Sequence, residues 1–341
     1  MNDLPQVTAI VLCRNEAKFI TTCLDSIIAN DYPKDKLEIL VVDGMSTDGT
    51  REIIKEYENK FTFVKLVDNP RKITPCAFNR GIKAAKGEIV IILGGHSTYH
   101  KDYIFKSVKY LNEYKADNVG GRVEMLPRSN TLLGKAITIA FSHPFCAGNS
   151  TFRRNYKEMK WVDTVFGGCY RKTLFDKIGY FNEKLINSQD MEFNIRLKKA
   201  GGKILLHPEI VSCYYVRSDF INYCKHNFRN GFWAIYPTKF VPIPLSWRHY
   251  VPLTFVLSLV VLGILGMVNW LAGLLFLIIL GLYLATSLAF SLQIAIKEKD
   301  ISYLFVMPIL FAAFHFGYGL GSIYACSVFF LPESKENIVN V

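Results

Sequence analysis

The chain has 341 residues, half of them hydrophobic, and a formal net charge of +11. That length holds one large domain or two smaller ones, and the hydrophobic fraction is high for a soluble protein. Its basic residues are dispersed and no nucleic-acid-binding module accompanies them, which argues against a nucleic-acid partner. The charge instead suits a face resting on anionic lipid, or a site that handles phosphates. The N-terminus lacks a basic leader, so we expect no signal peptide and a cytoplasmic N-terminal region.

The first hundred residues alternate between short apolar runs and amphipathic stretches. The apolar runs are too short for helices and show no polar alternation, which is typical of strands in a parallel sheet covered on both faces. We therefore predict a doubly wound α/β domain. Its expected strands are 7–13, 37–42, 63–67 and 88–93, and its expected helices are 17–29, 50–60 and 75–86.

Polar residues follow every expected strand, at the edge where such a sheet binds its ligands. No GxGxxG follows the first strand, which argues against a dinucleotide-binding dehydrogenase. The four strand ends carry Arg14-Asn15, Asp43-Gly44, Asp68-Asn69 and Gly94-Gly95-His96.

Beyond residue 101 the pattern becomes mixed α+β, with a strand expected at "NVGGRVEML" (118–126). The segment 218–249 combines aromatic and cationic residues and leads into a proline-rich stretch. This composition predicts an interfacial amphipathic helix and linker next to a membrane.

The last part of the chain has two long stretches without any Asp, Glu, Lys or Arg, from Val251 to Ile296 and from Ile301 to Pro332. About 20 apolar residues suffice to cross a bilayer as a helix. The alternative, a pair of buried core helices, is disfavoured because core helices rarely stay uncharged for so long. Lysine and arginine before the first span and between the last two predict a cytoplasmic catalytic side, with the tail outside. The expected division is a domain at 1–217, spans at 251–268, 271–292 and 303–330 within a membrane region 250–332, and a tail at 333–341.

Two short segments carry the chemistry. In "VVDGMSTDGT" a strand delivers Asp43 to the crevice, where its carboxylate can accept hydrogen bonds from a base or ribose. An Asx-turn followed by a helix cap explains the same string without any ligand. In "NSQDMEFNIRLKKAGG" Asp190 lies in the first turn of an expected helix that Gly201 terminates. The helix dipole keeps such a carboxylate ionised, which suits a general base, although simple capping is the alternative.

Together these segments resemble glycosyltransferase family 2, whose fold is termed GT-A. "DGMSTDGT", "NRGIKAAKGEIVIIL" and "QDMEFNIRLKKAGGKI" occur in the order and at the spacings of that family. More narrowly, "NPRKITPCAFNRGI", "GGHSTYHKDYI", "ADNVGGRVE", "WVDTVFGGCYRK", "NSQDMEFNIRL" and "FRNGFWA" resemble the succinoglycan-biosynthesis-type glucosyltransferases. The resemblance covers residues 7 to 250.

The resemblance implies transfer of a sugar, with inversion, from a nucleotide-sugar, expected to be UDP-linked, to a polyprenyl-linked saccharide at the bilayer surface. Asp190 then corresponds to the catalytic base, with Gln189 where the family has Glu. The implied donor-binding residues are Arg14, Asn15, Asp43, Asp68, Arg71, Gly94, Gly95 and His96. The implied acceptor-binding residues are Gly167, Gly168, Gln189, Arg229 and Trp233.

The chain departs from the family at the fourth strand end. Most members carry Asp-x-Asp there, and the subgroup carries Asp-Ala-His, whereas this chain has Gly94-Gly95-His96. A second family ligand, a histidine, aligns near Tyr214. A transferase must neutralise the departing diphosphate, either with a divalent cation or with fixed basic groups.

Three interpretations of this turn remain open. In the first, His96 is a ligand of Mn²⁺ or Mg²⁺ together with the donor phosphates. In the second, the turn is only structural. In the third, the site binds a metal only weakly, and basic side chains neutralise the diphosphate instead. The candidates are Arg14, Arg71, Lys72 and Arg80. Two other functions also remain as alternatives: synthesis of a polyprenyl-phosphate monosaccharide, and a non-catalytic scaffold in a polysaccharide assembly complex.

Overall fold

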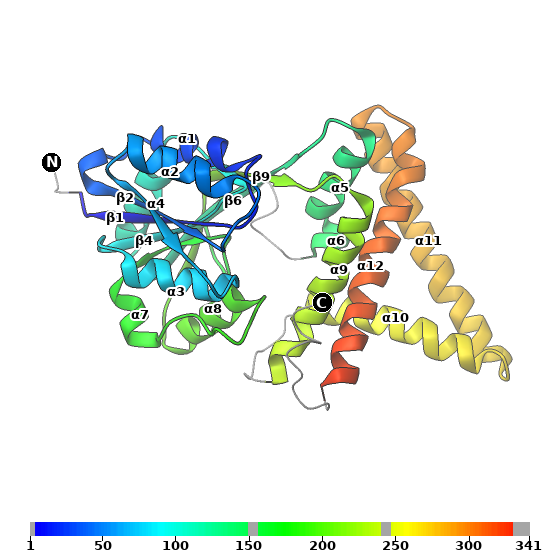
Figure 1. Ribbon diagram of the computed structural model, residues 1–341. Helices are drawn as coiled ribbons and strands as arrows, with labels where there is room; N and C mark the ends of the chain where they lie inside the picture. The colour runs from blue at the N-terminus through cyan, green and yellow to red at the C-terminus, as the bar shows by residue number, and fades with distance from the viewer. Residues whose placement is uncertain (1–3, 149–155, 240–246, 330–341) are drawn as a thin grey trace. The chain divides into compact units, whose positions relative to one another are not determined.

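The computed structural model describes residues 4–148, 156–239 and 247–329. It divides into two compact units that are not continuous in sequence (Figure 1). Unit 1 is Met1–Glu124 with Thr151–Tyr215, and unit 2 is Met125–Ser150 with Val216–Val341. The segment 125–148 thus groups with the C-terminal helices, whereas the sequence predicted one N-terminal domain over 1–217. The predicted tail and the linker residues 240–246 lie outside the described residues.

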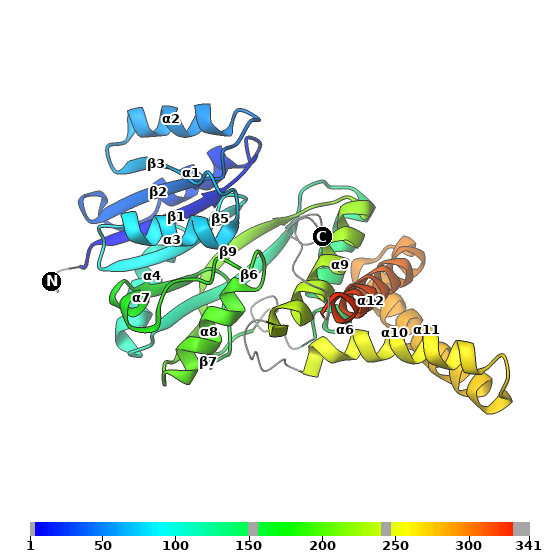
Figure 2. The ribbon, with the colours of Figure 1, turned by 60° about the horizontal axis from the view of Figure 1, so that its bottom comes forward.

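Unit 1 is built on one mixed sheet whose strands run in the order β3-β2-β1-β4-β8-β6-β9-β5, with β7 paired to β9 (Figure 2). The first four strands in this order are parallel, and β8 is antiparallel to β4. The strands are β1 (Val7–Cys13), β2 (Leu37–Asp43), β3 (Val64–Asp68), β4 (Ile89–Gly94), β5 (Ser97–Tyr99), β6 (Asn118–Pro127), β7 (Lys160–Trp161), β8 (Gly168–Arg171) and β9 (Ile204–Val216).

The register brings the carboxyl ends of the parallel strands to one edge. Cys13 lies opposite Asp43, and Asp43 lies opposite Asp68. Leu12 lies opposite Gly94. The polar residues that follow these strands therefore share one edge, as the sequence predicted.

Helices cover both faces of the sheet, because the side chains of β1, β2 and β4 are apolar on both faces. One face packs against α1 (Ile20–Ile28), α2 (Thr50–Lys60) and α4 (Tyr103–Glu113). The other packs against α3 (Thr74–Ala84), α7 (Thr173–Ile178) and α8 (Gln189–Lys199). A 3₁₀ turn, Lys34–Lys36, precedes β2. The predicted doubly wound α/β arrangement is confirmed.

One predicted helix begins later than expected. The sequence predicted a helix from residue 17, whereas α1 begins at Ile20. The amide of Glu16 donates to the Thr50 hydroxyl (2.9 Å), and the amide of Ala17 donates to the Asp48 carboxylate (3.1 Å). These amides are bonded to the loop after β2 and to the first residue of α2. The segment before α1 forms a turn of its own, in which the Glu16 carbonyl accepts from the amides of Phe19 (2.8 Å) and Ile20 (2.9 Å).

Unit 2 consists of helices that pack through small residues. The α9 and α12 backbones approach so closely that a Cβ on Gly231 would lie 1.9 Å from the carbonyl oxygen of Tyr318. A Cβ on Gly321 would lie 2.0 Å from that of Phe228. The helices are α5 (Leu132–Ser142), α6 (Pro144–Ala147), α9 (Phe220–Ile235), the 3₁₀ turn Tyr236–Lys239, α10 (Trp247–Leu265), α11 (Trp270–Glu298) and α12 (Ser302–Val328).

Two of these helices, α11 and α12, are long and apolar enough to cross a membrane. They correspond to the predicted spans 271–292 and 303–330, although residue 330 lies outside the described residues. The first predicted span, 251–268, falls on α10, whose apolar part His249–Leu265 is shorter. The predicted break between the spans 251–268 and 271–292 is present, because Asn269 is the N-cap of α11 and its side chain accepts a hydrogen bond from the amide of Leu271 (2.9 Å).

The surface of α11 fits a lipid environment. Leu277 and Leu282 are each more than 60% exposed within the structure, and only 11% of the apolar stretch is buried. Exposing so long an apolar surface to water is unfavourable, whereas the hydrocarbon core of a bilayer solvates it well.

Candidate active site at the strand ends

The loops after β1 and β2 form one hydrogen-bonded rim at the carboxyl edge of the sheet. The amide of Asn15 donates to the Ser46 hydroxyl (2.8 Å), and the amide of Thr47 donates to the Asn15 side chain (3.0 Å). Asn15 adopts a left-handed conformation with φ +55°, which asparagine tolerates better than most residues. Arg14 is exposed, and its side-chain carbons pass close to Gly44. The two predicted residues Arg14 and Asn15 therefore lie on this rim.

Asp43 is completely buried and its carboxylate is already used within the protein. It accepts hydrogen bonds from the amide of Ser46 (2.9 Å) and from the Ser46 hydroxyl. Arg51 donates through Nη1 to Asp43 (2.7 Å) and through Nη2 to Asp68 (2.7 Å). The hydrogen bonds from Ser46 form the turn that the structural alternative for "VVDGMSTDGT" expects, whereas the N-cap of α2 is Gly49, without a side-chain cap. Of the two carboxylates that Arg51 joins, Asp68 is the accessible one, at 56% exposed.

Arg71, the predicted phosphate-side cation, is exposed and paired. Its Nη1 lies 2.5 Å from Glu183, which also accepts from the amide of the Asn79 side chain (2.9 Å). The Asn79 hydrogen bond, with a smaller contribution from Arg71, holds the pKa of Glu183 below its ordinary value. Because the ion pair is exposed to water, Arg71 can exchange Glu183 for a phosphate at little cost.

The two glycines of the Gly94-Gly95-His96 turn differ in whether the structure requires glycine at that position. A Cβ on Gly95 would lie 2.9 Å from the carbonyl oxygen of Leu12, so the close approach of β1 requires glycine there. A Cβ on Gly94 would meet only the Ser97 hydroxyl, at 3.6 Å. Gly95 is therefore needed for packing, whereas the space at Gly94 accepts a side chain.

His96 lies in a polar and aromatic setting. Its Nδ1 is 3.3 Å from a carboxylate oxygen of Glu16, and its ring contacts the Tyr214 ring edge-on with centroids 5.0 Å apart. Tyr214 is the position where the family resemblance aligned a second metal ligand. An imidazole beside a carboxylate is a donor set that suits Mn²⁺, so the residues present fit a divalent cation completed by donor phosphates.

Asp190 and Gln189 open α8, as the sequence predicted. Asp190 is exposed in the first helical turn, and Gly201 follows the helix end with φ +81°. Gln189 is buried, and its Oε1 has no hydrogen-bond partner in the described part of the chain. This oxygen lies one residue from the predicted base, and acceptor contact by Gln189 stays a prediction.

Gly167 and Gly168 link Asp190 to the end of β4. Gly168 pairs with Ile92, and a Cβ on Gly167 would lie 2.5 Å from the Ile92 carbonyl oxygen. The Tyr170 hydroxyl donates to the Gly167 carbonyl (3.3 Å). Burial raises the pKa of the Tyr170 hydroxyl, and the nearby charge of Asp190 raises it further. Asp190, Tyr170 and the double glycine therefore lie close to the strand end that carries His96.

A polar network that the sequence did not reveal supports this region. The Asn118 side chain donates to the Tyr170 hydroxyl (3.1 Å) and to Asn194 (3.0 Å), and Asn194 donates to Thr164 (3.0 Å). It joins α8 to β6 and β8 across the interior. Glu16 and Arg51 were also missed. The only signal for Glu16 was its place directly after Arg14-Asn15, and Arg51 gave none.

The two predicted acceptor-binding residues on α9, Arg229 and Trp233, differ in their burial. Arg229 is exposed, whereas Trp233 is only 2% exposed and contacts the rings of Phe232 and Tyr236 edge-on. The two residues share a helix face by spacing, but Trp233 packs inside unit 2. Trp233 therefore shapes the core of unit 2 rather than its surface, and an acceptor contact remains a prediction for Arg229.

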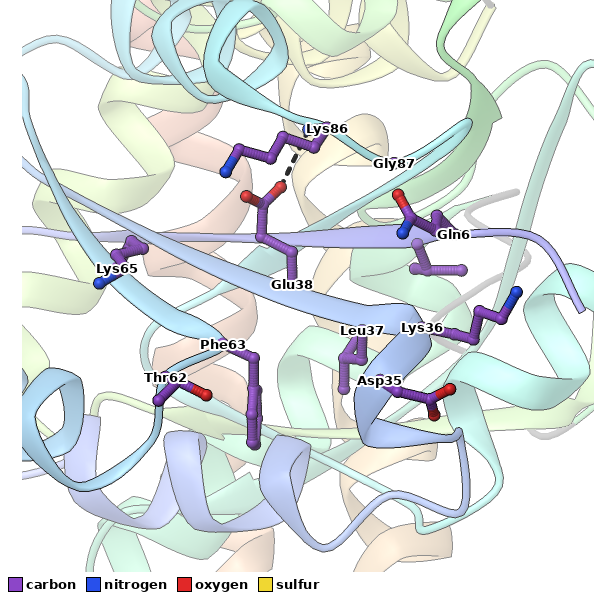
Figure 3. A pocket seen from close by; sticks show the side chains of 11 residues that line it. Gln6, Asp35, Lys36, Leu37, Glu38, Thr62, Phe63, Lys65, Lys86 and Gly87 are labelled. Atoms are coloured by element: carbon purple, nitrogen blue, oxygen red, sulfur yellow. Dashed lines mark hydrogen bonds between the residues drawn. The ribbon is translucent and has the colours of Figure 1, made fainter.

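A cavity of about 220 Å³ lies at the opposite edge of unit 1, at the amino ends of β1, β2 and β3 (Figure 3). Lys36, Lys65 and Lys86 line it together with Glu38, which accepts from the backbone amide of Lys86 (2.9 Å). None of the predicted site residues lines it. Ligands of doubly wound sheets bind at the carboxyl edge, so this cavity is separate from the candidate site.

Comparison with known proteins agrees with this geometry. Residues 8–179 match the sequence model described as "Glycosyl transferase family 2". The chain belongs to glycosyl transferase family 2. The match covers the strand-end rim, the Gly94-His96 turn and the Gly167-Gly168 pair, and it ends just before α8.

Relatives of this family 2 glycosyltransferase extend over the whole chain. It is 30% identical over 335 residues to the Methanococcus voltae enzyme named dolichyl N-acetyl-alpha-D-glucosaminyl phosphate 3-beta-D-2,3-diacetamido-2,3-dideoxy-beta-D-glucuronosyltransferase, covering 95% of this chain and 99% of that one. It is 24% identical to the succinoglycan biosynthesis protein ExoA of Rhizobium meliloti, covering 85% and 86% of the two chains. The glycosyltransferase AglE of Haloferax volcanii is 27% identical over 67% of this chain and 72% of its own. The predicted family is confirmed, and the two apolar helices with these relatives indicate membrane association.

The fold of this glycosyltransferase is also found in a solved structure. The mannosyltransferase PcManGT of Pyrobaculum calidifontis, in complex with GDP-Man and Mn²⁺, superimposes with a TM-score of 0.61 at 21% identity, covering 90% of this chain and 87% of that one. The predicted GT-A fold followed by C-terminal helices is confirmed.

Proposed function

We propose that this glycosyltransferase is membrane-anchored and inverting, and that it moves a sugar from a UDP-sugar to a lipid-linked saccharide in the synthesis of an exported or cell-surface glycan. The observation that carries the proposal is the position of Asp190. It is an exposed carboxylate at the amino end of α8, and its charge acts on the Tyr170 hydroxyl, which donates to Gly167 next to the strand that pairs with β4. A base at that point has the helix dipole to keep it ionised, and its exposure leaves it accessible to an incoming acceptor sugar.

Asp190 would accept the proton of an acceptor hydroxyl as its oxygen attacks the anomeric carbon of the donor. A new carbon–oxygen bond forms on one face of the sugar, and the bond to the diphosphate breaks on the other. UDP leaves with the electron pair of the broken bond, so the configuration at the anomeric carbon is inverted. The Asn118-Tyr170-Asn194 network would hold α8 and the glycine pair at the separation that this attack needs.

The donor would lie along the carboxyl edge of β1 to β4. Asp68, held by the Arg51 guanidinium, would face the nucleoside. Arg14 and Arg71 would supply positive charge near the phosphates. His96 and Glu16 would hold a divalent cation, which when bound supplies charge that stabilises the departing diphosphate. With Gly94 in place of an acid, this cation is expected to bind weakly and to depend on the donor.

Lipid linkage of the acceptor is supported from two directions. The Methanococcus voltae relative, similar over almost its full length, is named for a dolichyl-phosphate-linked sugar. The two apolar helices would anchor unit 2 in the bilayer, with Arg229 of α9 exposed to contact an anionic acceptor. We propose a cytoplasmic catalytic side and a multi-pass anchor, following the distribution of lysine and arginine around the spans.

The test is Asp190→Asn in the full chain, purified in detergent or assayed in membranes with a panel of UDP-sugars and lipid-linked acceptors. Loss of a general base lowers turnover by about 10²–10⁴-fold. The matched control is Asp163→Asn, which removes another exposed carboxylate of unit 1 that pairs with Lys198 at the surface. UDP affinity should stay within about threefold in both variants, because neither aspartate contacts the nucleotide in this proposal. Full transferase activity of Asp190→Asn would contradict the assignment.

Two alternatives lead to different products or to none. A polyprenyl-phosphate monosaccharide synthase would use the bare lipid phosphate and yield a single sugar in phosphodiester linkage, whereas the proposed enzyme requires a sugar on its lipid. A non-catalytic scaffold would bind no UDP with or without Mn²⁺. Mass spectrometry of the lipid product and calorimetry with UDP distinguish the three.

A further inference from the structure

A second group of metal-binding side chains lies in unit 1, at three neighbouring strands. His100 directly follows β5, Glu124 lies in β6 and Cys213 lies in β9, and the sheet order places β9 between β6 and β5. Their ligand atoms all lie within 4.8 Å of one another. The Cys213 sulfur is 3.8 Å from Oε2 of Glu124. Segments far apart in the chain thus bring an imidazole, a carboxylate and a thiol to one point.

These three groups are the ligand types that zinc prefers. Zinc bonds of about 2.0–2.3 Å in a tetrahedral arrangement place any two ligand atoms about 3.3–3.8 Å apart. The sulfur-to-carboxylate distance already lies at the upper end of that interval. The widest separation in the group must close by only about 1 Å, which a rotation of the exposed His100 side chain supplies. The exposure of His100 also leaves room for water as the fourth ligand.

The backbone holds the three positions in place. The amide of His100 donates to the Val211 carbonyl (3.2 Å), and its carbonyl accepts from the Asn30 side chain (2.9 Å). Cys213 lies directly opposite Thr98 in the antiparallel pairing of β5 with β9. Only side-chain torsions therefore need to change for the ligands to converge, so little ordering entropy opposes binding.

This group is distinct from the candidate donor site. Tyr214, the next residue of β9, contacts the His96 ring. Successive side chains of a strand point to opposite faces, so Cys213 points away from His96. A cation bound by Cys213 would therefore not contact the donor phosphates.

An ordinary ion pair explains only part of the arrangement. Arg122 lies 2.8 Å from Oε1 of Glu124, and both side chains are partly exposed, so this pair contributes little. It leaves Oε2 directed at Cys213. Neither the ion pair nor the thiol–carboxylate contact accounts for the imidazole of His100 at the same point.

We propose that His100, Glu124 and Cys213 form a zinc site that joins β5, β6 and β9 in unit 1. On binding, the thiol releases its proton to solvent, and the metal takes the thiolate, one imidazole nitrogen and one carboxylate oxygen. The site would fasten β5 to β9 four residues beyond His96, so its role is structural support of the turn that faces the donor. It stands independently of the proposed glycosyl transfer.

The experiment titrates metal-free, detergent-solubilised full chain with Co²⁺ in the absence of any nucleotide, and follows the thiolate-to-cobalt charge-transfer absorption. We expect one equivalent to produce the band and Zn²⁺ to displace it, with a higher unfolding temperature in Zn²⁺. Cys213→Ser should abolish the band, and His100→Gln and Glu124→Gln should each weaken binding by at least about tenfold.

Matched variants decide the interpretation. Cys326→Ser, at an exposed cysteine of α12, should keep the band and its affinity. Asp190→Asn should also bind Co²⁺ like the unaltered chain, which separates this proposal from the catalytic one. A band that survives Cys213→Ser, or one lost in Cys326→Ser, would overturn the site. So would the absence of any band in the unaltered chain, whatever the transferase activity.

Discussion

Arg51 is the residue whose removal should cost unit 1 most among its charged side chains at the strand ends. Its guanidinium donates to Asp43 and to Asp68, each at 2.7 Å. The Asp43 side chain is fully buried, whereas Asp68 is 56% exposed. Arg51→Met keeps a straight apolar stem, so its main effect is to leave a buried carboxylate without its cation.

The magnitude follows from the two partners. Removing one member of a buried ion pair costs about 3–5 kcal/mol, whereas an exposed pair is worth about 0.2–1 kcal/mol. Asp43 keeps the amide and hydroxyl of Ser46, which lowers the penalty. We expect a loss of about 2–4 kcal/mol for Arg51→Met and no more than about 1 kcal/mol for Asp68→Asn. A unit of 150–250 residues loses about 2–4 °C per kcal/mol, so the midpoint should fall by about 4–16 °C.

The assay is thermal unfolding of the detergent-solubilised chain by scanning fluorimetry, with the double variant Asp43→Asn/Arg51→Met as the decisive control. Asparagine carries no charge, so the double variant should be at least as stable as Arg51→Met alone. The reasoning would be refuted if the double variant were clearly less stable than Arg51→Met. Equal losses for Arg51→Met and Asp68→Asn would refute it as well.

Three further predictions concern the turn at β4 and a buried histidine. Gly94→Asp should fit, because the nearest atom to its Cβ is 3.6 Å away, and it should tighten Mn²⁺ binding in the presence of UDP relative to Gly94→Ala; calorimetry that finds no difference would argue against a cation at His96. Gly95→Ala should instead lower stability by about 1–3 kcal/mol, since its Cβ would lie 2.9 Å from a backbone oxygen, and an unchanged melting temperature would contradict the packing argument. Burial lowers the pKa of His207, which stacks on Tyr110 with Glu113, Glu209, Lys106 and Lys109 around it. The folded state therefore binds fewer protons at His207 than the unfolded state does. The contribution of neutral His207 to the free energy of unfolding is thus fully present above about pH 6.5 and is lost as the pH falls. Melting curves between pH 7.5 and 5.5 should show a smaller decline for His207→Phe than for the unaltered chain.

Much of the fold was predictable from local patterns. The four parallel strands, the α8 helix that begins at Gln189 and the two long apolar helices appear close to their predicted bounds. Strand and helix periods and uninterrupted apolar runs depend on neighbours in the chain, so they can be read without a structure. The limits of this approach appear at α1, which begins at Ile20 and not at residue 17, after a segment whose amides at Glu16 and Ala17 bond to Thr50 and Asp48.

The candidate site was predictable only in part. Strand ends and the resemblance named Asp190 and the Gly94-His96 turn, because both follow from position in a recognisable motif. The burial of Asp43 and Trp233 was not foreseen, since burial depends on what packs above a residue. The segment 125–148 was likewise assigned to the N-terminal domain, although its helices pack with α12.

The sequence by itself determined the order of strands and helices, the apolar helices and the carboxylate that opens α8. These features arise from residues within a few positions of one another, where backbone geometry and hydrophobic periodicity act. The tertiary structure alone decided that Glu16 faces His96, that Arg51 joins Asp43 to Asp68, and that His100 and Cys213 meet Glu124. Those partners lie on different strands and loops, and only the sheet register and the packing of its faces bring their side chains within bonding distance.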